Sequence, residues 1–132
     1  MKKTGPKIFV VDDDFYFRKA VARILCYNGY DAIEVSSSIP VINSIIKERP
    51  DLILLDLYMP NAGGMEIINT MRRMNIDIPV VVISGLLTDL DIRILQEKGV
   101  KHFMAKPVRL KMLIKKVNEL FEKPASIDTE TL

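Results

Sequence analysis

Five short runs of aliphatic and β-branched residues recur along the chain, separated by longer segments of mixed polarity. The runs occupy residues 7–11, 31–35, 51–55, 78–84 and 101–105. The third and fourth runs are almost continuously apolar, which is typical of strands covered on both faces of a parallel sheet. The pattern therefore predicts five strands in a largely parallel sheet.

The segments between these runs repeat apolar residues at helical spacing. The first helix is expected to stop at Gly29, and the fourth to be capped by Thr88 and to close at Gly99. Ser38 is expected to cap the second helix, with Pro40 in its first turn, where a missing N–H costs little. The stripes of the first, third and fifth helices are Phe17, Val21, Ile24 and Leu25; Ile67, Ile68, Met71 and Met74; and Leu110, Leu113, Ile114, Val117 and Phe121.

Strand and helix alternate five times, which favours an α/β protein whose parallel strands are joined by right-handed crossovers. A length of 132 residues fits a single domain with a sizeable core. We assign residues 1–123 to this domain. Residues 124–132 are polar and aperiodic, and we interpret them as a flexible tail or the start of a linker.

Composition narrows the classes of function. Hydrophobic residues make up 48% of the chain, well above the content of a disordered protein, and a net charge of +2 is too small to indicate nucleic-acid binding. Cys26 is the only cysteine, so no intrachain disulfide can form, and no apolar run approaches the roughly 18 residues of a membrane span. We therefore expect a cytoplasmic protein that contacts neither a membrane nor nucleic acid.

Carboxylates follow two of the predicted strands. Asp12, Asp13 and Asp14 come directly after the first strand, and Asp56 comes directly after the third. The carboxyl ends of the strands in a doubly wound sheet meet at the ligand-binding edge, so these groups are expected to converge and repel one another. Mg²⁺ prefers oxygen ligands and often binds a phosphoryl oxygen as well, so the pattern predicts a Mg²⁺ site beside a phosphorylated partner. Aspartates also serve as helix caps, and we interpret Asp14 as the cap of the first helix.

Two further residues end strands at the same edge. Ser84, followed by Gly85, ends the fourth strand, and Lys106 follows the fifth. Taken alone, such a serine is usually a strand-end residue and such a lysine is usually solvated. Their place at the same sheet end as the carboxylates changes this interpretation: Gly85 would let a ligand approach the backbone closely, and the Lys106 ammonium would neutralise a carboxylate or a phosphoryl oxygen.

Four segments, VVDDD, LLDLYMP, VVISG and MAKPV, occur in this order and jointly resemble the receiver domain of two-component response regulators over residues 7–121. The resemblance implies a flavodoxin-like, doubly wound sheet with strand order 2-1-3-4-5 and helices on both faces. It also implies a phosphorelay signalling switch that catalyses its own aspartyl phosphorylation and slow dephosphorylation, and not an enzyme that releases a metabolic product.

The resemblance also implies roles for individual residues. Asp56 matches the aspartate that accepts a phosphoryl group from a sensor histidine kinase or a phosphotransfer protein. Asp12 and Asp13 match the pair that holds Mg²⁺, with Asp56 and the backbone carbonyl of Tyr58 as further ligands. The remaining matches are Ser84, which bonds the phosphoryl group and acts in the switch; Lys106, which pairs with that group and is expected to precede a cis bond to Pro107; and Phe103, the aromatic switch residue.

The resemblance places the response to phosphorylation on the fourth helix, the fifth strand and the fifth helix, a face that would control a downstream protein partner or a second copy of the chain. On the fourth helix, Leu90 and Ile94 are expected to point away from the stripe formed by Ile92 and Leu95. Leu90 and Ile94 are therefore a candidate partner patch, although scattered apolar surface residues are common.

The sequence departs from the family pattern at Gly63, where an aspartate is usual; glycine is still an acceptable helix cap. Tyr58 and Leu86, two positions after the acceptor and after the hydroxyl residue, are both bulky. We hypothesise that they shield the phosphoryl group from water.

Three other functions fit the sequence less well. An aspartyl-phosphate hydrolase or phosphotransferase would favour a second aspartate at the place of Tyr58. A flavin carrier would need a loop rich in glycine and hydroxyl groups, and the acidic residues 12–14 would repel its phosphate. A degenerate receiver that only binds partners would not need the complete set of acceptor, metal and lysine residues.

Overall fold

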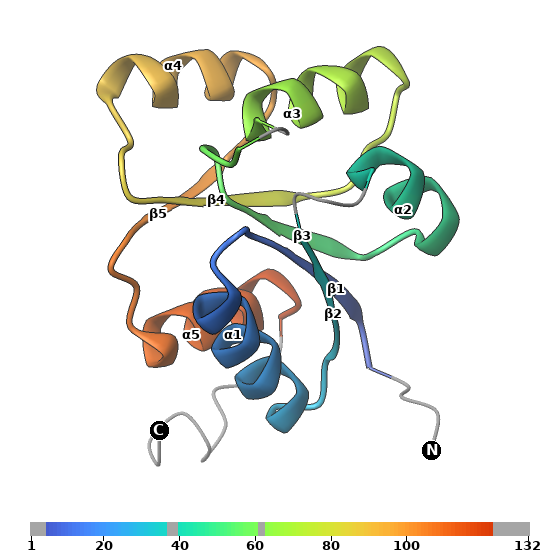
Figure 1. Cartoon of the computed structure of the whole chain (residues 1–132), viewed down its shortest axis with the longest axis vertical. Coiled ribbons are helices and arrows are strands. Elements are labelled where there is room, and N and C mark those ends of the chain that lie inside the picture. The colour runs from blue at the N-terminus through green and yellow to red at the C-terminus, as the bar shows by residue number, and fades with distance from the viewer. Residues whose placement is uncertain (1–4, 37–39, 61–62, 123–132) are drawn as a thin grey trace.

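The computed structural model describes residues 5–36, 40–60 and 63–122. Strands and helices alternate along the chain, as the sequence predicts (Figure 1). In chain order the elements are β1 (Lys7–Val11), α1 (Phe15–Tyr27), β2 (Asp31–Val35), α2 (Val41–Glu48), β3 (Leu52–Leu55), α3 (Gly64–Arg73), β4 (Val80–Ser84), α4 (Asp89–Glu97), β5 (His102–Ala105) and α5 (Leu110–Leu120).

The strands form one parallel sheet in the order β2-β1-β3-β4-β5, which confirms the doubly wound topology. Three strands begin one or two residues later than predicted. Just before β3 begins, the Asp51 carboxylate accepts the Lys7 backbone N–H at 2.8 Å, and the Asp51 backbone N–H donates to the Lys7 carbonyl at 2.7 Å. At β4, Pro79 has no N–H to donate, and its carbonyl accepts from Ile53 at 3.0 Å before the strand begins.

Two layers of helices sandwich the sheet, with α2, α3 and α4 on one face and α1 and α5 on the other (Figure 1). Successive residues of a strand point to opposite faces of the sheet, so each strand contributes side chains to two hydrophobic cores, one on each face. In β1, Phe9 and Val11 belong to the core beneath α2, α3 and α4, whereas Ile8 and Val10 belong to the core beneath α1 and α5. All four are at most 2% exposed, and burial of such a side chain contributes about 1.5–3 kcal/mol.

The caps of the helices mostly follow the sequence signals. The Asp14 carboxylate accepts the backbone N–H groups of Tyr16 and Phe17, so Asp14 is the N-cap of α1. Thr88 caps α4 in a reciprocal arrangement with Asp91. At the other ends, Gly29 and Gly99 have φ values of 89° and 90°, which suit glycine.

The start of α2 differs from the prediction. Pro40 is the N-cap and does not lie in the first turn, because its ψ of 100° keeps it extended and the helix begins at Val41. Ser38, the predicted cap, lies outside the described residues. So does the predicted tail, residues 124–132. Gly63 is the N-cap of α3, and its cap has no side-chain hydrogen bond.

The described helices are short relative to a lipid bilayer. The longest, α1, has 13 residues. Within the described ranges, none combines the length and the apolar composition that crossing a membrane requires.

Candidate functional site

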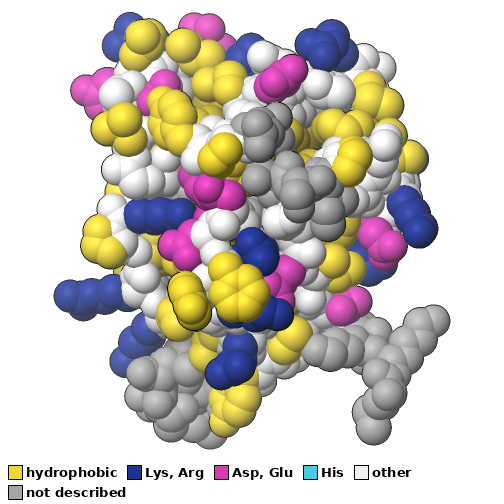
Figure 2. Space-filling model, viewed as in Figure 1, with side chains coloured by type: hydrophobic (Ala, Val, Ile, Leu, Met, Phe, Trp, Pro, Cys, Tyr) yellow, Lys and Arg dark blue, Asp and Glu magenta, His cyan; other side chains and the backbone are white. Residues whose placement is uncertain are grey.

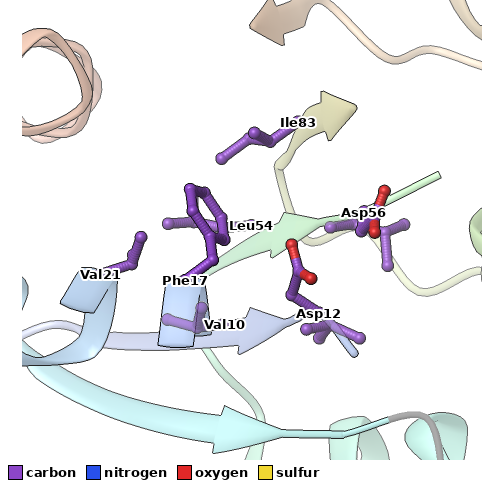
Figure 3. Close-up of a pocket in the computed structure, with 9 residues that line it drawn as sticks. Val10, Asp12, Phe17, Val21, Leu54, Asp56 and Ile83 are labelled. Carbon is purple, nitrogen blue, oxygen red and sulfur yellow. The ribbon is translucent and has the colours of Figure 1, made fainter. Parts of the chain in front are cut away.

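The first and third strands end side by side. Val11 and Leu55 are partners in the register of β1 and β3, so the next residues, Asp12 and Asp56, leave the sheet together. The backbone N–H of Asp56 donates to the Val11 carbonyl at 3.0 Å, which extends the ladder by one step. Figure 3 shows the carboxylates of Asp12 and Asp56 at the ends of these two strands.

The carboxylates of Asp12, Asp13 and Asp56 form what we term the acidic cluster. One ligand atom from each residue lies within 4.8 Å of the others. Asp12 and Asp56 are only 2% and 7% exposed, whereas Asp13 faces solvent. Oδ1 of Asp12 accepts the Asp14 backbone N–H at 2.9 Å, and Oδ1 of Asp56 accepts the Tyr58 backbone N–H at 3.2 Å. The predicted convergence of these carboxylates is therefore present.

Lys106 brings a positive charge into the acidic cluster from the end of β5. Its Nζ lies 2.8 Å from Asp12 Oδ2 and 3.7 Å from Asp56 Oδ2. The Lys106 backbone N–H donates to the Ser84 carbonyl at 2.9 Å, which holds the residue against β4. The Lys106–Pro107 bond is cis, as the resemblance implies. On the face shown in Figure 2, acidic and basic side chains meet near the middle, with hydrophobic side chains beside them.

The electrostatics of the site favour an added cation. Burial raises the pKa of Asp56, and the charge of Asp12 raises it further, while Lys106 acts in the opposite direction. Burial lowers the pKa of Lys106, but the hydrogen bond to Asp12 and the nearby carboxylates outweigh burial, so its pKa lies above the ordinary value. Lys106 is therefore protonated at neutral pH, and its single charge faces three carboxylates.

The acidic cluster fits a hard divalent cation. Its three side chains offer only oxygen atoms, and Asp13 remains open to solvent, which suits an ion such as Mg²⁺ that retains several water ligands. Tyr58, whose backbone carbonyl is the predicted further ligand, is held next to the site by its N–H bond to Asp56.

The two predicted switch residues lie on neighbouring strands. Ser84 ends β4 and is 1% exposed, and its Oγ accepts the Leu86 backbone N–H at 3.3 Å. Phe103 is the register partner of Val82 across β4 and β5. Its half-buried ring packs against the core beneath α2, α3 and α4.

The bulky residues Tyr58 and Leu86 are 51% and 64% exposed. The candidate patch on α4 differs from its prediction: Leu90 is 61% exposed, but Ile94 is half-buried. At 3.6 residues per turn, Ile94 lies about 40° round the helix from Leu90, nearer to the side of the buried Leu95. Only Leu90 of the pair therefore presents an exposed apolar side chain.

Sequence reasoning missed two contacts at the site. The Phe17 ring lies beneath the Lys106 ammonium, with Nζ 4.4 Å from the ring centroid. The Tyr58 hydroxyl donates to Asp91 Oδ2 at 2.8 Å. Both contacts join segments far apart in the sequence, and Phe17 fits the apolar stripe of α1 so well that its position signals only core packing.

The fold and the site together define a flavodoxin-like α/β domain with an acidic cluster and a lysine at the carboxyl edge of its sheet. The profile of the response regulator receiver domain matches residues 8–118. The chain belongs to this family of two-component signalling domains, and the resemblance found in the sequence is confirmed.

Named relatives agree with this assignment. The transcriptional regulatory protein PrrA of Mycobacterium tuberculosis is 30% identical over 129 residues, which cover 97% of this chain and 55% of PrrA. The response regulator MprA of Mycobacterium ulcerans is 27% identical over 124 residues, which cover 94% of this chain and 53% of MprA. The chain thus spans about half the length of these relatives.

Solved structures share the fold. The receiver domain of a Francisella response regulator superposes with a TM-score of 0.81 at 26% identity, covering 89% of this chain and 98% of that domain. The signal receiver domain of a LuxO repressor protein from Vibrio parahaemolyticus gives a TM-score of 0.83 at 22% identity, covering 90% and 92%. The second likeness supports the fold alone.

Proposed function

We propose that the chain is a phosphorylation-activated switch in which Asp56 accepts a phosphoryl group from a sensor histidine kinase or a phosphotransfer protein. The observation that carries the proposal is the convergence of the acidic cluster with the Lys106 ammonium, which lies 2.8 Å from Asp12 and 3.7 Å from Asp56. This combination offers a nucleophile, a cation site and a positive charge within one small volume.

In the proposed transfer, an Asp56 carboxylate oxygen attacks phosphorus in line with the leaving group. The new O–P bond forms as the N–P bond of the phosphohistidine breaks, and the imidazole nitrogen retains the electron pair. Lys106 neutralises charge that develops on the phosphoryl oxygens. Asp12 and Asp13, with Asp56 and the Tyr58 carbonyl, would hold a Mg²⁺ ion, which when bound supplies further positive charge to the same oxygens.

The proposed response begins with Ser84. Its hydroxyl would bond the new phosphoryl group and move away from the core, and Phe103 would turn inward into the space released. The change would reshape the face formed by α4, β5 and α5 and alter its affinity for a protein partner or a second copy. A local change in charge thereby shifts the balance between two packings.

The proposal concerns the receiver domain alone. PrrA is named a transcriptional regulatory protein and is about twice as long as the part that this chain covers. We propose that the domain itself acts in the cytoplasm through protein contacts, without binding nucleic acid or a membrane.

Acetyl phosphate tests the proposal directly, because it supplies a phosphoryl group without a kinase. The chain is incubated with acetyl phosphate with and without Mg²⁺, and its intact mass is measured. We expect one phosphoryl adduct on the parent, only with Mg²⁺, and none on Asp56→Asn. Asp51→Asn is the matched control, since Asp51 directly precedes β3 at the end opposite to Asp56, and its replacement should leave the adduct unchanged. A parent without an adduct would be a degenerate receiver, and the proposal would be wrong.

A further inference from the structure

The ammonium group of Lys106 has three neighbours of different kinds. Nζ donates to Asp12 Oδ2 at 2.8 Å, lies 3.7 Å from Asp56 Oδ2, and stands 4.4 Å from the centroid of the Phe17 ring. Carboxylates attract an ammonium group through charge, whereas the face of an aromatic ring attracts it through the negative potential of its π system. Phe17 is therefore a third partner, and it cannot serve as a metal ligand or a proton carrier.

We propose that Phe17 is a positioning residue for phosphoryl transfer, holding the Lys106 ammonium so that one N–H faces the acceptor. An ammonium group has three N–H donors. One is used by Asp12, and one faces the ring, which leaves the third for Asp56 and for a phosphoryl oxygen attached there. The inference rests on the proposed function of Asp56, since without phosphoryl transfer the lysine would have nothing to orient toward.

Phe17 is anchored through both its backbone and its side chain. The backbone N–H of Phe17 donates to Oδ1 of the capping Asp14 at 3.2 Å, which fixes the first turn of α1 directly after the acidic residues. The half-buried side chain packs against the core beneath α1 and α5. Figure 3 shows the ring standing beside Leu54, between α1 and the carboxylates of Asp12 and Asp56. The same residue is thus anchored in the core and exposed to the site.

Other cation–ring contacts on this helix lack these features. Phe15, two residues earlier, has Lys19 Nζ at 5.4 Å and the Arg18 guanidinium at 5.6 Å from its ring centroid. Its side chain is 52% exposed, so water competes with both contacts. Lys106 is nearer to its ring, and its side chain is only 22% exposed, so a π face is worth more there. Phe15 is consequently a matched control for Phe17.

Without the ring, the Lys106 ammonium should stay charged but should no longer be held with an N–H toward Asp56. Leucine at position 17 keeps an apolar side chain against the core, yet it offers no π face. The ammonium group would then be free to move toward Asp12 and water, away from the acceptor. Tyrosine keeps the ring and should preserve the position of Lys106.

The first experiment measures the rate of adduct formation from acetyl phosphate and Mg²⁺ by intact mass. We expect Phe17→Leu to react roughly three- to tenfold more slowly, the range that a partly desolvated cation–π contact represents. Phe17→Tyr should stay within about twofold of the parent, and Phe15→Leu should react at the parent rate. Thermal unfolding of each variant identifies any that does not fold, and Phe17→Met then replaces Phe17→Leu.

The second experiment separates positioning from packing. Phe17→Leu is combined with Lys106→Met. We expect the double variant to form the adduct as fast as Lys106→Met alone, because the ring acts only through the lysine. Proton NMR adds a direct signature: because Nζ lies 4.4 Å from the ring centroid, we expect the ring current of Phe17 to shield the ε-methylene protons of Lys106, and their signals should move downfield in Phe17→Leu but not in Phe15→Leu.

The outcomes distinguish the two proposals. An adduct that forms equally fast on the parent and on a folded Phe17→Leu overturns the positioning role alone. The same proportional loss with and without Lys106, or ε-methylene shifts that do not change, also overturns it, because both indicate ordinary core packing. No adduct on the parent overturns the proposed function instead, and the positioning role falls with it.

Discussion

The hydroxyl of Tyr58 donates to Asp91 Oδ2 at 2.8 Å, and the same oxygen accepts the backbone N–H of Thr88 at 3.2 Å. A side chain two residues after the acceptor is thereby attached to the capping box that begins α4. The hydrogen bond is the first cause both of the raised pKa of Tyr58 and of the lowered pKa of Asp91. The phenol therefore stays neutral and the carboxylate stays ionised throughout the neutral pH range.

This contact sharpens the prediction that Tyr58 shields the phosphoryl group. Its hydroxyl is attached to α4, so the half-exposed side chain is tied to a neighbouring element at the edge of the sheet that carries the site. We expect Tyr58→Ala to lose its phosphoryl group severalfold faster than the parent, because water reaches the acyl phosphate more easily. The decay of the adduct is followed by intact mass after acetyl phosphate is removed.

Tyr58→Phe is the control for the hydroxyl, since it keeps the ring but releases it from Asp91. A decay rate between those of the parent and of Tyr58→Ala would mean that attachment to α4 contributes to shielding. If Tyr58→Ala decays at the parent rate, Tyr58 does not shield the phosphoryl group.

Asp56 should reduce the stability of the metal-free protein at neutral pH. Its pKa is raised in the folded state, chiefly by burial, so its ionised form is less favourable there than in the unfolded chain. Below its unfolded pKa, about 3.9, the group is protonated in both states and costs nothing. The cost grows as pH rises above the unfolded pKa, because the unfolded chain ionises first, and it is complete once pH exceeds the raised pKa of the folded state.

Asp56→Asn should therefore raise the thermal unfolding midpoint at pH 7 without Mg²⁺, and the gain should shrink toward acid pH. Added Mg²⁺ should stabilise the parent more than Asp56→Asn, because the ion binds the acidic cluster of the folded state. Scanning calorimetry across pH, with and without Mg²⁺, measures both effects. An Asp56→Asn variant that is less stable than the parent at pH 7 would contradict the sign.

Asp13 and Asp14 are adjacent and both exposed, yet their replacement should affect different properties: the stability of the fold for Asp14 and the affinity for Mg²⁺ for Asp13. Asp14→Ala removes the cap of α1 and should cost about 1 kcal/mol in the free energy of unfolding, while leaving Mg²⁺ affinity nearly unchanged. Asp13→Asn should lower the affinity for Mg²⁺ at least about tenfold, since even residues that only hydrogen-bond to the ligands of a metal contribute that much. Urea unfolding and calorimetric Mg²⁺ titration give the two values. A reversed pattern would mean that the acidic cluster is misassigned.

Much of the fold was predictable because its signals are local. Asp14 and Thr88 act on the N–H groups of the turn that follows them, and the apolar runs specify buried strands wherever they pair. The strand order could not be predicted in this way, because hydrophobic periodicity does not distinguish one order from another. That prediction came from the resemblance to the receiver family. The convergence of Asp12 and Asp56 then followed from two strands that end in register.

The contacts that modify the site could not be read from the sequence. Phe17 meets Lys106, and Tyr58 meets Asp91, only because the fold brings distant segments together. Each of these side chains also has an ordinary local explanation, in a helical stripe or at an exposed turn. Ile94 shows the same limit. Its spacing on the helix predicted the same exposure as that of Leu90, but in the folded domain its side chain is half-buried.

Leu90 is the remaining candidate for partner binding on α4. Its side chain is 61% exposed, whereas Ile94 is half-buried, so a charge at position 90 should not disturb the core. We expect Leu90→Glu to be phosphorylated at the parent rate but to lose phosphorylation-dependent self-association, measured by analytical ultracentrifugation with acetyl phosphate and Mg²⁺. Met112→Glu on α5, at 50% exposure, is the comparison variant: loss of association there as well would mean that the effect spans the whole face. Equal association of the parent and Leu90→Glu in the phosphorylated state would show that Leu90 is only a scattered apolar residue.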